Sequence, residues 1–297
     1  MNLTHLENRS QERLESLLKE SNSTEKVLAH FFLHESDVGV MRNGGRNGAR
    51  FAPRAVINVL KKMAWHGPWN QPVKLHFFEN SEAEKKNFLE TQEQSYEVLS
   101  KLIKGNSRKI QIGGGHDHIY PFLKAIATKH KKIVCLNIDA HCDTRTDHEK
   151  HSGTPFRQFA GLEICEFHLI QIGIHSFANS DSTLSNVPGA MVTTYEAPLE
   201  ENIFKTIEQI LKTLEVGTAV VFSLDMDALE SSVMEGVSAV NHQGLNLFEV
   251  NGLLDLVLKE KELVPYFGFY EYNPLYDNLS QKGARLMASL IYKILVK

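Results

Sequence analysis

Short apolar runs alternate with amphipathic segments along most of this 297-residue chain. The runs lack the strict apolar–polar alternation of a half-exposed strand, so they are typical of parallel strands that helices cover on both faces. The segments between them carry apolar residues at helical spacing. The predicted strands are residues 73–78, 109–112, 133–138, 168–174, 219–224 and 266–270. The predicted helices are residues 54–63, 83–103, 119–129, 203–214, 247–259 and 280–296, and residues 3–33 also read as a helix with a charged outer face.

This alternation predicts a doubly wound α/β sandwich of three layers, with a mainly parallel sheet between two layers of helices. No internal repeat or low-complexity linker divides the chain. We therefore expect a single domain over residues 1–297, with residues 1–35 as an amino-terminal helical extension. In folds of this class, ligands bind beyond the carboxyl ends of the strands. We therefore expect the functional site at that edge of the sheet.

Three clusters of acidic and histidine residues follow three of the predicted strands. They read Gly-Gly-Gly-His at 113–116, Asp-Ala-His-Cys-Asp at 139–143 and Ser-Leu-Asp-Met-Asp at 223–227. An extended backbone would point the side chains of Asp139, His141 and Asp143 in one direction, because they lie two residues apart. Asp225 and Asp227 repeat that spacing. The clusters therefore bring several ligand-type side chains to one edge of the sheet.

So many carboxylates cannot gather at one place without a cation. Carboxylates combined with imidazole suit Mn²⁺, with Zn²⁺, Fe²⁺ and Co²⁺ as competitors. The number of ligands predicts two metals that share carboxylates, an arrangement that activates water near neutral pH. Taken singly, an Asp-x-Asp pair could be a helix cap and Gly-Gly-Gly-His a simple turn. Three clusters behind three buried strands favour a binuclear metallohydrolase instead.

Composition excludes several other classes of protein. Hydrophobic residues make up 42% of the chain and charged residues 23%, as in ordinary soluble globular proteins. The formal net charge of −4 gives no general attraction to nucleic acid or to an anionic membrane. We expect no signal peptide and no membrane span, because no apolar stretch is long enough. The three cysteines suit a reducing cytoplasm better than a disulfide framework, so a cytoplasmic enzyme with a small-molecule substrate is expected.

The motifs together resemble the ureohydrolase family, which comprises arginases, agmatinases and formimidoylglutamases. The resemblance rests on Gly-Gly-Gly-His-Asp, Asn-Ile-Asp-Ala-His-Cys-Asp-Thr-Arg, Ser-Leu-Asp-Met-Asp and Glu-Tyr-Asn-Pro (271–274), which occur in the family's order within residues 37–290. It implies the arginase fold, with a parallel sheet of about eight strands and two Mn²⁺ ions per chain. We also expect a homo-oligomer. The metal ligands that it implies are His116, Asp139, His141, Asp143, Asp225 and Asp227.

Three features resemble formimidoylglutamases more than arginases or agmatinases. A glycine precedes His116, where arginases and agmatinases usually place an acidic residue. The segments 42–55 and 152–158 are also similar to the formimidoylglutamase pattern. Arginases place an acidic residue after the strand matching 168–174 to hold the substrate's amino group, whereas this chain continues with His175-Ser-Phe-Ala-Asn. The resemblance implies hydrolysis of N-formimidoyl-L-glutamate to L-glutamate and formamide, as in histidine degradation.

The resemblance also implies roles at the two ends of this substrate. Glu271, in the Glu-x-Asn-Pro motif, would bind the planar amidine cation by charge-assisted hydrogen bonds. Arg145 follows the ligand Asp143, and its fork matches a substrate carboxylate. Its alternative role is to tie the loop to Asp147 or Glu149.

Two further polar residues follow Arg145, in a segment that differs from the arginase pattern. Ser152 would donate a hydrogen bond to the substrate, although a serine before a glycine is often only a turn residue. Arginases have a proton-transfer histidine shortly after this Ser-Gly, but this chain has Pro155 and Phe156 there. His151 is therefore the candidate for proton transfer. Together with Asp143 and Glu271 it makes up the predicted catalytic set.

The loop after the last aspartate pair departs from the family pattern. The family usually continues with Asp-Pro and a loop reading roughly Ala-Pro-Gly-Val-Ser-Ala-Pro, whereas this chain has Glu230-Ser231 and then Met-Glu-Gly-Val-Ser-Ala-Val at 234–240. The prolines are absent and Gly-Val-Ser-Ala is kept. Two alternatives stay open: a related ureohydrolase acting on a guanidino compound such as arginine, agmatine or guanidinobutyrate, and a catalytically silent relative that serves as a binding protein.

Overall fold

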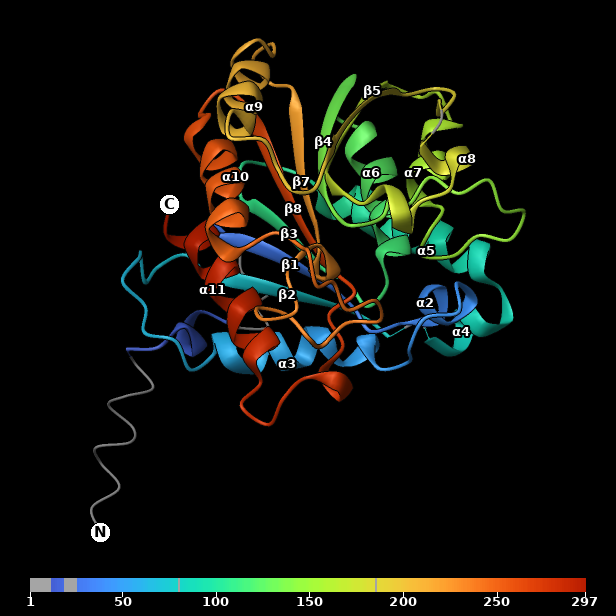
Figure 1. Ribbon diagram of the computed structural model, residues 1–297. Coiled ribbons are helices and arrows are strands. Elements are labelled where there is room, and N and C mark those ends of the chain that lie inside the picture. Colours follow the sequence, from blue (N-terminus) through green and yellow to red (C-terminus); the bar gives the residue numbers. More distant parts are fainter. Residues whose placement is uncertain (1–11, 19–25, 80, 185) are drawn as a thin grey trace.

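A single sheet of eight parallel strands runs through the protein (Figure 1). The computed structural model describes residues 12–18, 26–79, 81–184 and 186–297. In sheet order β2-β1-β3-β8-β7-β4-β5-β6, every neighbouring pair is parallel. The strands are β1 (Ala29–His34), β2 (Val73–Phe78), β3 (Arg108–Ile112), β4 (Lys132–Ile138), β5 (Glu166–Ile174), β6 (Met191–Glu196), β7 (Ala219–Asp225) and β8 (Val264–Tyr270).

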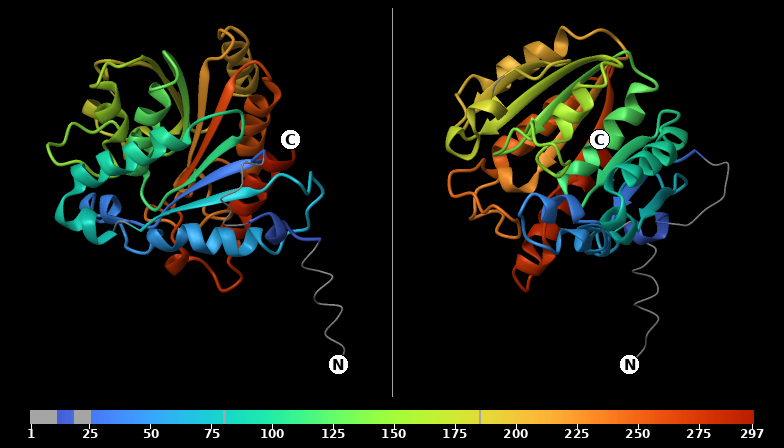
Figure 2. Two further views of the ribbon diagram at one scale, coloured as in Figure 1. Left: turned by 180° about the vertical axis from the view of Figure 1, so that it is seen from behind. Right: turned by 90° about the vertical axis from the view of Figure 1, so that its right-hand side faces the viewer.

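Helices cover both faces of the sheet, as the two views in Figure 2 show. On one face α3 packs beside α11 and α9 beside α10, while α5, α6 and α7 pack on the other. The described helices are α2 (Val38–Arg42), α3 (Ala52–Leu60), α4 (Ser81–Lys86), α5 (Phe88–Leu102), α6 (Ile119–Ala127), α7 (Pro155–Ala160), α8 (Asp181–Leu184), α9 (Ile203–Lys212), α10 (Leu247–Lys259) and α11 (Lys282–Val296). The predicted three-layer α/β fold is therefore confirmed.

The central strands are apolar on both faces because each face meets a different layer of helices. In β7 the side chains of Val220, Phe222 and Leu224 join the apolar core under α9, α10 and α11. Those of Ala219 and Val221 join the core under α5, α6 and α7. All five side chains are fully buried. This double burial is the physical reason for the unbroken apolar runs in the sequence.

The order of the strands brings the three sequence clusters together. After β3 the chain crosses to β4, moves outward through β5 and β6, and then returns to place β7 and β8 in the gap between β3 and β4. The carboxyl ends of β3, β8, β7 and β4 consequently lie side by side. Each cluster follows one strand of this group, so the break in strand order marks the ligand-binding edge.

All six predicted strands are present, with ends within two residues of those expected. Two further strands were missed. β6 is an edge strand that pairs only with β5 and is largely exposed, so it lacks a continuous apolar run. The other, β1, overturns part of the helix predicted over residues 3–33, because Ala29–His34 is a buried strand in the sheet.

The remaining helix predictions need two adjustments. Leu14–Leu17 forms only a short 3-10 helix, while residues 3–11 and 19–25 of the predicted amino-terminal extension lie outside the described residues. The helix predicted over 83–103 is two helices, because the side chain of Asn87 accepts a hydrogen bond from the Glu90 amide and starts a new helix there. Among the described residues, no helix is both long and apolar enough to cross a membrane.

Candidate metal centre

Three glycines carry the chain from β3 to His116, and the reason is close approach rather than a turn. A side chain on Gly114 would place its Cβ 1.8 Å from the carbonyl oxygen of Ser36. One on Gly113 would lie 2.6 Å from the ring of Tyr270. None of the three glycines has a positive φ. The run therefore lets His116 sit against neighbouring backbone at the end of the sheet.

The chain turns within both acidic clusters, although Ser223 to Asp225 still belong to β7. β4 ends at Ile138, and Oδ1 of Asp139 accepts a hydrogen bond from the His141 amide at 2.7 Å. Oδ1 of Asp225 likewise accepts from the Asp227 amide at 2.9 Å. Asp143 has a φ of 52°, in the left-handed region that is unfavourable for residues with a Cβ. The expected extended backbone was wrong, and the side chains converge because the chain bends after each strand.

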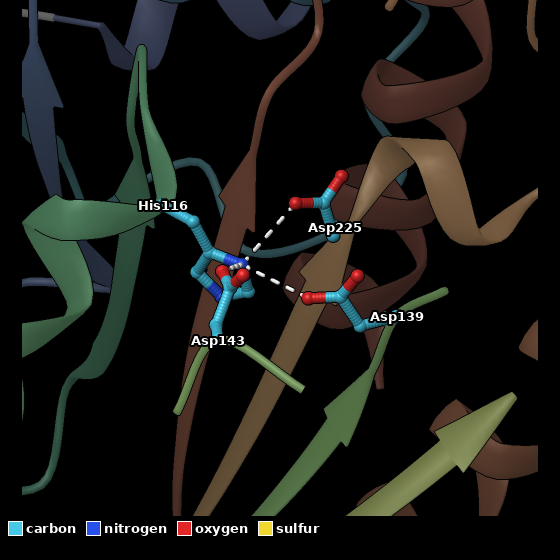
Figure 3. A group of neighbouring side chains, drawn as sticks. All are labelled: His116, Asp139, Asp143 and Asp225. Atoms are coloured by element: carbon cyan, nitrogen blue, oxygen red, sulfur yellow. Dashed lines mark ion pairs between the residues drawn. The ribbon is translucent and has the colours of Figure 1, made fainter. Parts of the chain in front are cut away.

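The six predicted ligands form two groups that share one aspartate. Figure 3 shows the first group, His116 with Asp139, Asp143 and Asp225. In the first group, Nδ1 of His116 lies 3.0 Å from Asp143 Oδ2, and 3.2 Å from Oδ2 of both Asp139 and Asp225. In the second, Nδ1 of His141 lies 3.1 Å from Asp227 Oδ2 and 3.6 Å from Asp139 Oδ1. The two oxygens of Asp139 therefore face different groups.

The convergence is that of metal ligands rather than of hydrogen-bond partners. Nδ1 of His116 is buried and makes no well-aligned hydrogen bond, although three carboxylate oxygens surround it. Oδ1 of Asp227 is also buried without a partner. Burial and the charges of Asp227 and Asp139 raise the pKa of Asp225 well above its usual value. Two divalent cations would relieve this crowding, so the residues fit a binuclear site.

A layer of polar side chains beneath the ligands was missed by the sequence analysis. Ser223 in β7 places its Oγ 2.8 Å from Nε2 of His116. Asn137 in β4 donates to Asp139 Oδ2 at 3.3 Å and to Gln171 Oε1 at 2.9 Å. The sequence does contain a sign of this layer, because each of these polar residues lies inside an otherwise apolar strand. Such side chains orient metal ligands and tune their affinity.

Asn179 fixes the loop on both sides of His141. Its Oδ1 accepts a hydrogen bond from the Cys142 amide at 2.8 Å. Its Nδ2 donates to the carbonyl oxygens of Ala140 and His175, both at 2.9 Å. All the bonds of this side chain therefore go to backbone, and two of them bracket His141. Asn179 follows no recognisable motif, so sequence reasoning had no means to find it.

A cavity of about 750 Å³ opens over the two ligand groups. Glu271 lines it, and its Oε1 accepts a hydrogen bond from the His116 amide at 3.0 Å. Its φ of 64° is left-handed, a conformation that costs about 1–3 kcal/mol and turns the side chain from β8 into the cavity. Burial, together with the charges of Asp227 and Asp143, raises the pKa of Glu271 to about 8. A cationic group bound beside it would favour the ionised form.

Arg145 lines the same cavity and is exposed. Both alternative partners considered from the sequence are engaged elsewhere. Asp147 Oδ2 lies 2.9 Å from His151 Nε2, and Glu149 pairs with Arg42 at 3.2 Å. No carboxylate of the described residues lies within ion-pair distance of the Arg145 guanidinium.

Ser152 and His151 lie side by side but face different ways. Ser152 lines the cavity, and its Oγ accepts a hydrogen bond from Asn43 at 3.2 Å, which leaves its own proton to donate. His151 does not line the cavity. Its Nδ1 accepts from the Gly153 amide at 3.0 Å and its Nε2 faces Asp147. The structure therefore brings Ser152 to the site but not the ring of His151.

Comparison with known proteins identifies the family. The family model described as "Arginase family" matches residues 37–296, which is most of the chain. This chain belongs to the arginase family. The resemblance seen in its motifs is thereby confirmed.

Relatives and solved structures point the same way. The formimidoylglutamase of Vibrio cholerae is 27% identical over 280 residues, which cover 88% of this chain and 81% of that protein. The formimidoylglutamase of an Enterobacter species is 28% identical over 267 residues, covering 87% and 82%. The structure of formimidoylglutamase from Bacillus subtilis aligns with a TM-score of 0.82 at 20% identity, covering 95% of this chain and 90% of that one. The structure of Trypanosoma cruzi formiminoglutamase with Mn²⁺₂ aligns with a TM-score of 0.79 at 22% identity, covering 96% and 97%. The predicted arginase fold is confirmed.

Substituting single aspartates should remove the two metal ions one at a time. Asp143 and Asp227 each belong to one ligand group, whereas Asp139 belongs to both. We expect two Mn²⁺ per reconstituted wild-type chain, about one in Asp143→Ala and Asp227→Ala, and fewer than one in Asp139→Ala. Elemental analysis after dialysis measures this, with the exposed Asp181→Ala as a control that keeps two ions. A wild-type protein that binds at most one ion would contradict a binuclear site.

Asn179 is expected to act on metal affinity through the loop it fixes. Asn179→Ala removes the bonds that bracket His141, so Mn²⁺ affinity should fall by about 10- to 100-fold, the range seen for residues that orient metal ligands. Asn179→Asp keeps the acceptor for the Cys142 amide and should lose less. Calorimetric titration with Mn²⁺ makes the measurement, and Asn106→Ala, at an exposed asparagine, is the matched control. Unchanged affinity in Asn179→Ala would refute the positioning role.

Proposed function

We propose that this protein hydrolyses N-formimidoyl-L-glutamate to L-glutamate and formamide. The names of its relatives support this substrate, as do the three motif features that resemble formimidoylglutamases. The observation that carries the proposal is that one cavity is lined by both a carboxylate and a guanidinium. Glu271 offers a buried carboxylate for a cation, and Arg145 offers a guanidinium that no described carboxylate pairs. The substrate has an amidine cation at one end and carboxylates at the other.

The six ligands would hold two Mn²⁺ ions, His116, Asp143 and Asp225 on one side and His141 and Asp227 on the other, with Asp139 between them. Such a pair, when bound, would lower the pKa of water and so supply a nucleophile near neutral pH.

The remaining residues bind and orient the substrate. Oε2 of Glu271 accepts no hydrogen bond from a described residue, so it is open to the amidine nitrogens. Arg145 would hold a substrate carboxylate by two parallel hydrogen bonds, and Ser152 would donate a third. Anchoring both ends of a short molecule fixes the carbon between them over the ligand groups, which is a large part of catalysis. A proton-transfer role for His151 would have to run through Asp147, which does line the cavity.

A guanidino substrate is the second candidate, and two observations count against it. The residue after β5 is His175 rather than an acidic residue, and it does not line the main cavity. The motif that precedes His116 also differs from that of arginases and agmatinases. A catalytically silent relative is not favoured either, because all six ligand positions are filled and converge.

We also propose that the enzyme acts in histidine degradation, that it is cytoplasmic and that it forms a homo-oligomer. The described cysteines Cys135, Cys142 and Cys165 are free, which suits a reducing compartment.

The direct test of function is a panel of substrates. The Mn²⁺-loaded protein is incubated with formimidoylglutamate, arginine, agmatine and guanidinobutyrate, and formamide, urea and ammonia are measured separately. We expect formamide from formimidoylglutamate with the highest kcat/KM. More efficient release of urea from any guanidino compound would overturn the substrate, although not the family.

Glu271→Gln should lower turnover while leaving the metals in place. The amide keeps the shape of the side chain but cannot neutralise the amidine, and losing a charged partner in a buried hydrogen bond costs on the order of 2–5 kcal/mol. The measurement is kcat for formimidoylglutamate together with Mn²⁺ content. Glu97→Gln, on the exposed side of α5, is the control. Loss of metal or of folding in Glu271→Gln would show that Glu271 is structural.

Arg145→Lys should act mainly on KM. Lysine keeps the charge but removes the two-pronged donor, so KM for formimidoylglutamate should rise far more than Mn²⁺ content or kcat changes. Arg42→Lys is the matched control, because Arg42 is a nearby arginine that binds Glu149 instead of lining the cavity. Equal effects of the two substitutions on KM would remove Arg145 from the substrate site.

A further inference from the structure

Asn43 lines the main cavity over the ligand groups, and the proposed function gives it no part in binding or catalysis. It is the first residue after α2 and belongs to segment 42–55, one of the two segments that are similar to formimidoylglutamases. The other is segment 152–158, which begins with Ser152. The two segments lie far apart in the sequence but meet at the wall of the cavity, where Asn43 contacts Ser152. This contact is therefore a candidate for a role in substrate binding.

Two hydrogen bonds attach Ser152 to α2 and to the residue that follows this helix. The Ser152 amide donates to the carbonyl oxygen of Gly39 at 3.2 Å. Nδ2 of Asn43 donates to Ser152 Oγ, also at 3.2 Å. The first bond fixes the backbone of Ser152, and the second fixes its hydroxyl group.

The direction of the second bond decides what the hydroxyl group can do. A serine hydroxyl carries one proton, and an amide nitrogen can only donate. Because Oγ accepts from Asn43, its own proton is not used in this bond, and no described residue accepts that proton elsewhere. The proton is left for a ligand in the cavity. An aspartate at position 43 would have the same shape but would take this proton itself.

Arg145 lies beside the same contact. Its amide donates to the carbonyl oxygen of Gly153 at 2.9 Å, so the loop that carries Arg145 closes on the residue after Ser152. A Cβ added to Gly153 would lie 3.2 Å from both Asn43 Nδ2 and Arg145 Cδ. The amide of Asn43 and the stem of Arg145 therefore flank Gly153, and Ser152 is its neighbour in the chain. Three polar side chains thus gather at one place on the cavity wall.

We propose that Asn43 positions the Ser152 hydroxyl group for a carboxylate of the substrate and so favours substrates that bear one. This role rests on the proposed function, in which Arg145 and Ser152 hold that carboxylate. Asn43 is a positioning residue, because it acts by keeping the Ser152 proton free for the ligand. It carries no charge, so it does not repel the carboxylate. A donor that is oriented before the ligand arrives loses less entropy on binding.

Asn43→Asp reverses the bond while keeping the shape of the side chain. The aspartate accepts the Ser152 proton and adds a negative charge to the wall, so L-glutamate should bind at least about ten-fold more weakly. Ligand-observed NMR measures its dissociation constant for the Mn²⁺-loaded protein, and kcat and KM are measured for formimidoylglutamate. We expect KM to rise with the dissociation constant while kcat changes little. The matched control is Asn47→Asp, which adds the same charge at an exposed asparagine of the same segment, away from the cavity.

A double-mutant cycle shows whether Asn43 acts through Ser152. Asn43→Ala and Ser152→Ala should each weaken L-glutamate binding and raise KM. In the Ser152→Ala background, Asn43→Ala should have little further effect, because the hydroxyl group that it orients is gone. Equal effects of Asn43→Ala with and without this hydroxyl group would overturn the positioning role. So would an Asn43→Asp protein that binds L-glutamate like wild type.

The outcomes separate this role of Asn43 from the proposed function. Mn²⁺ content and melting temperature are measured for each variant, and if neither Asn43 variant matches wild type in both, Asn43 is structural and the proposed role fails. Formamide release without coupling between Asn43 and Ser152 would overturn the role of Asn43 alone. Coupling in L-glutamate binding supports that role even if no formamide is released from formimidoylglutamate. A wild-type protein that neither binds L-glutamate nor hydrolyses formimidoylglutamate would overturn both.

Discussion

Mutual repulsion among four buried aspartates is the constraint on which the rest of this structure depends. Asp139, Asp143, Asp225 and Asp227 surround two imidazoles at the carboxyl edge of the sheet. Burial and the charge of Asp139 raise the pKa of Asp143. Burial and the charges of Asp227 and Asp139 also raise the pKa of Asp225. Without cations, the protein holds these groups together at a cost in free energy. With two cations the same arrangement becomes a binding site, so metal binding and the local structure stabilise each other.

The fold meets this constraint by assembling rigid elements around one edge. Inserting β7 and β8 between β3 and β4 brings four strand ends together, and these strands are buried on both faces. The glycines before His116 allow close backbone approach, and left-handed residues at positions 143 and 271 direct carboxylates into the cavity. Asn137 and Asn179 then restrict the loops. The turns that carry the ligands are therefore held by hydrogen bonds and close backbone packing, as a precise metal site requires.

The sequence predicted the ligands better than it predicted their geometry. Spacing and residue type were sufficient to select six side chains that converge at one edge of the sheet, because few other roles explain repeated carboxylates behind buried strands. Their role as metal ligands stays a prediction. The extended backbone assumed for Asp139 to Asp143 was wrong, since the turn depends on contacts with distant residues such as Asn179. Likewise β1 and β6 were missed. Their strand form depends on neighbours in the sheet, β1 lying between two strands and β6 on an edge. Tertiary contacts that no local pattern encodes decided each of these cases.

Asp139 belongs to both ligand groups, so we expect it to join two metal ions in one site. An anomalous-scattering crystal structure of the Mn²⁺-loaded protein tests it most directly. The account predicts two manganese peaks about 3.5–4 Å apart, with one oxygen of Asp139 bound to each ion. The ion on the His116 side should contact Asp143 and Asp225, and the ion on the His141 side should contact Asp227. A single peak, or a second peak bound by residues outside these six, would contradict the account.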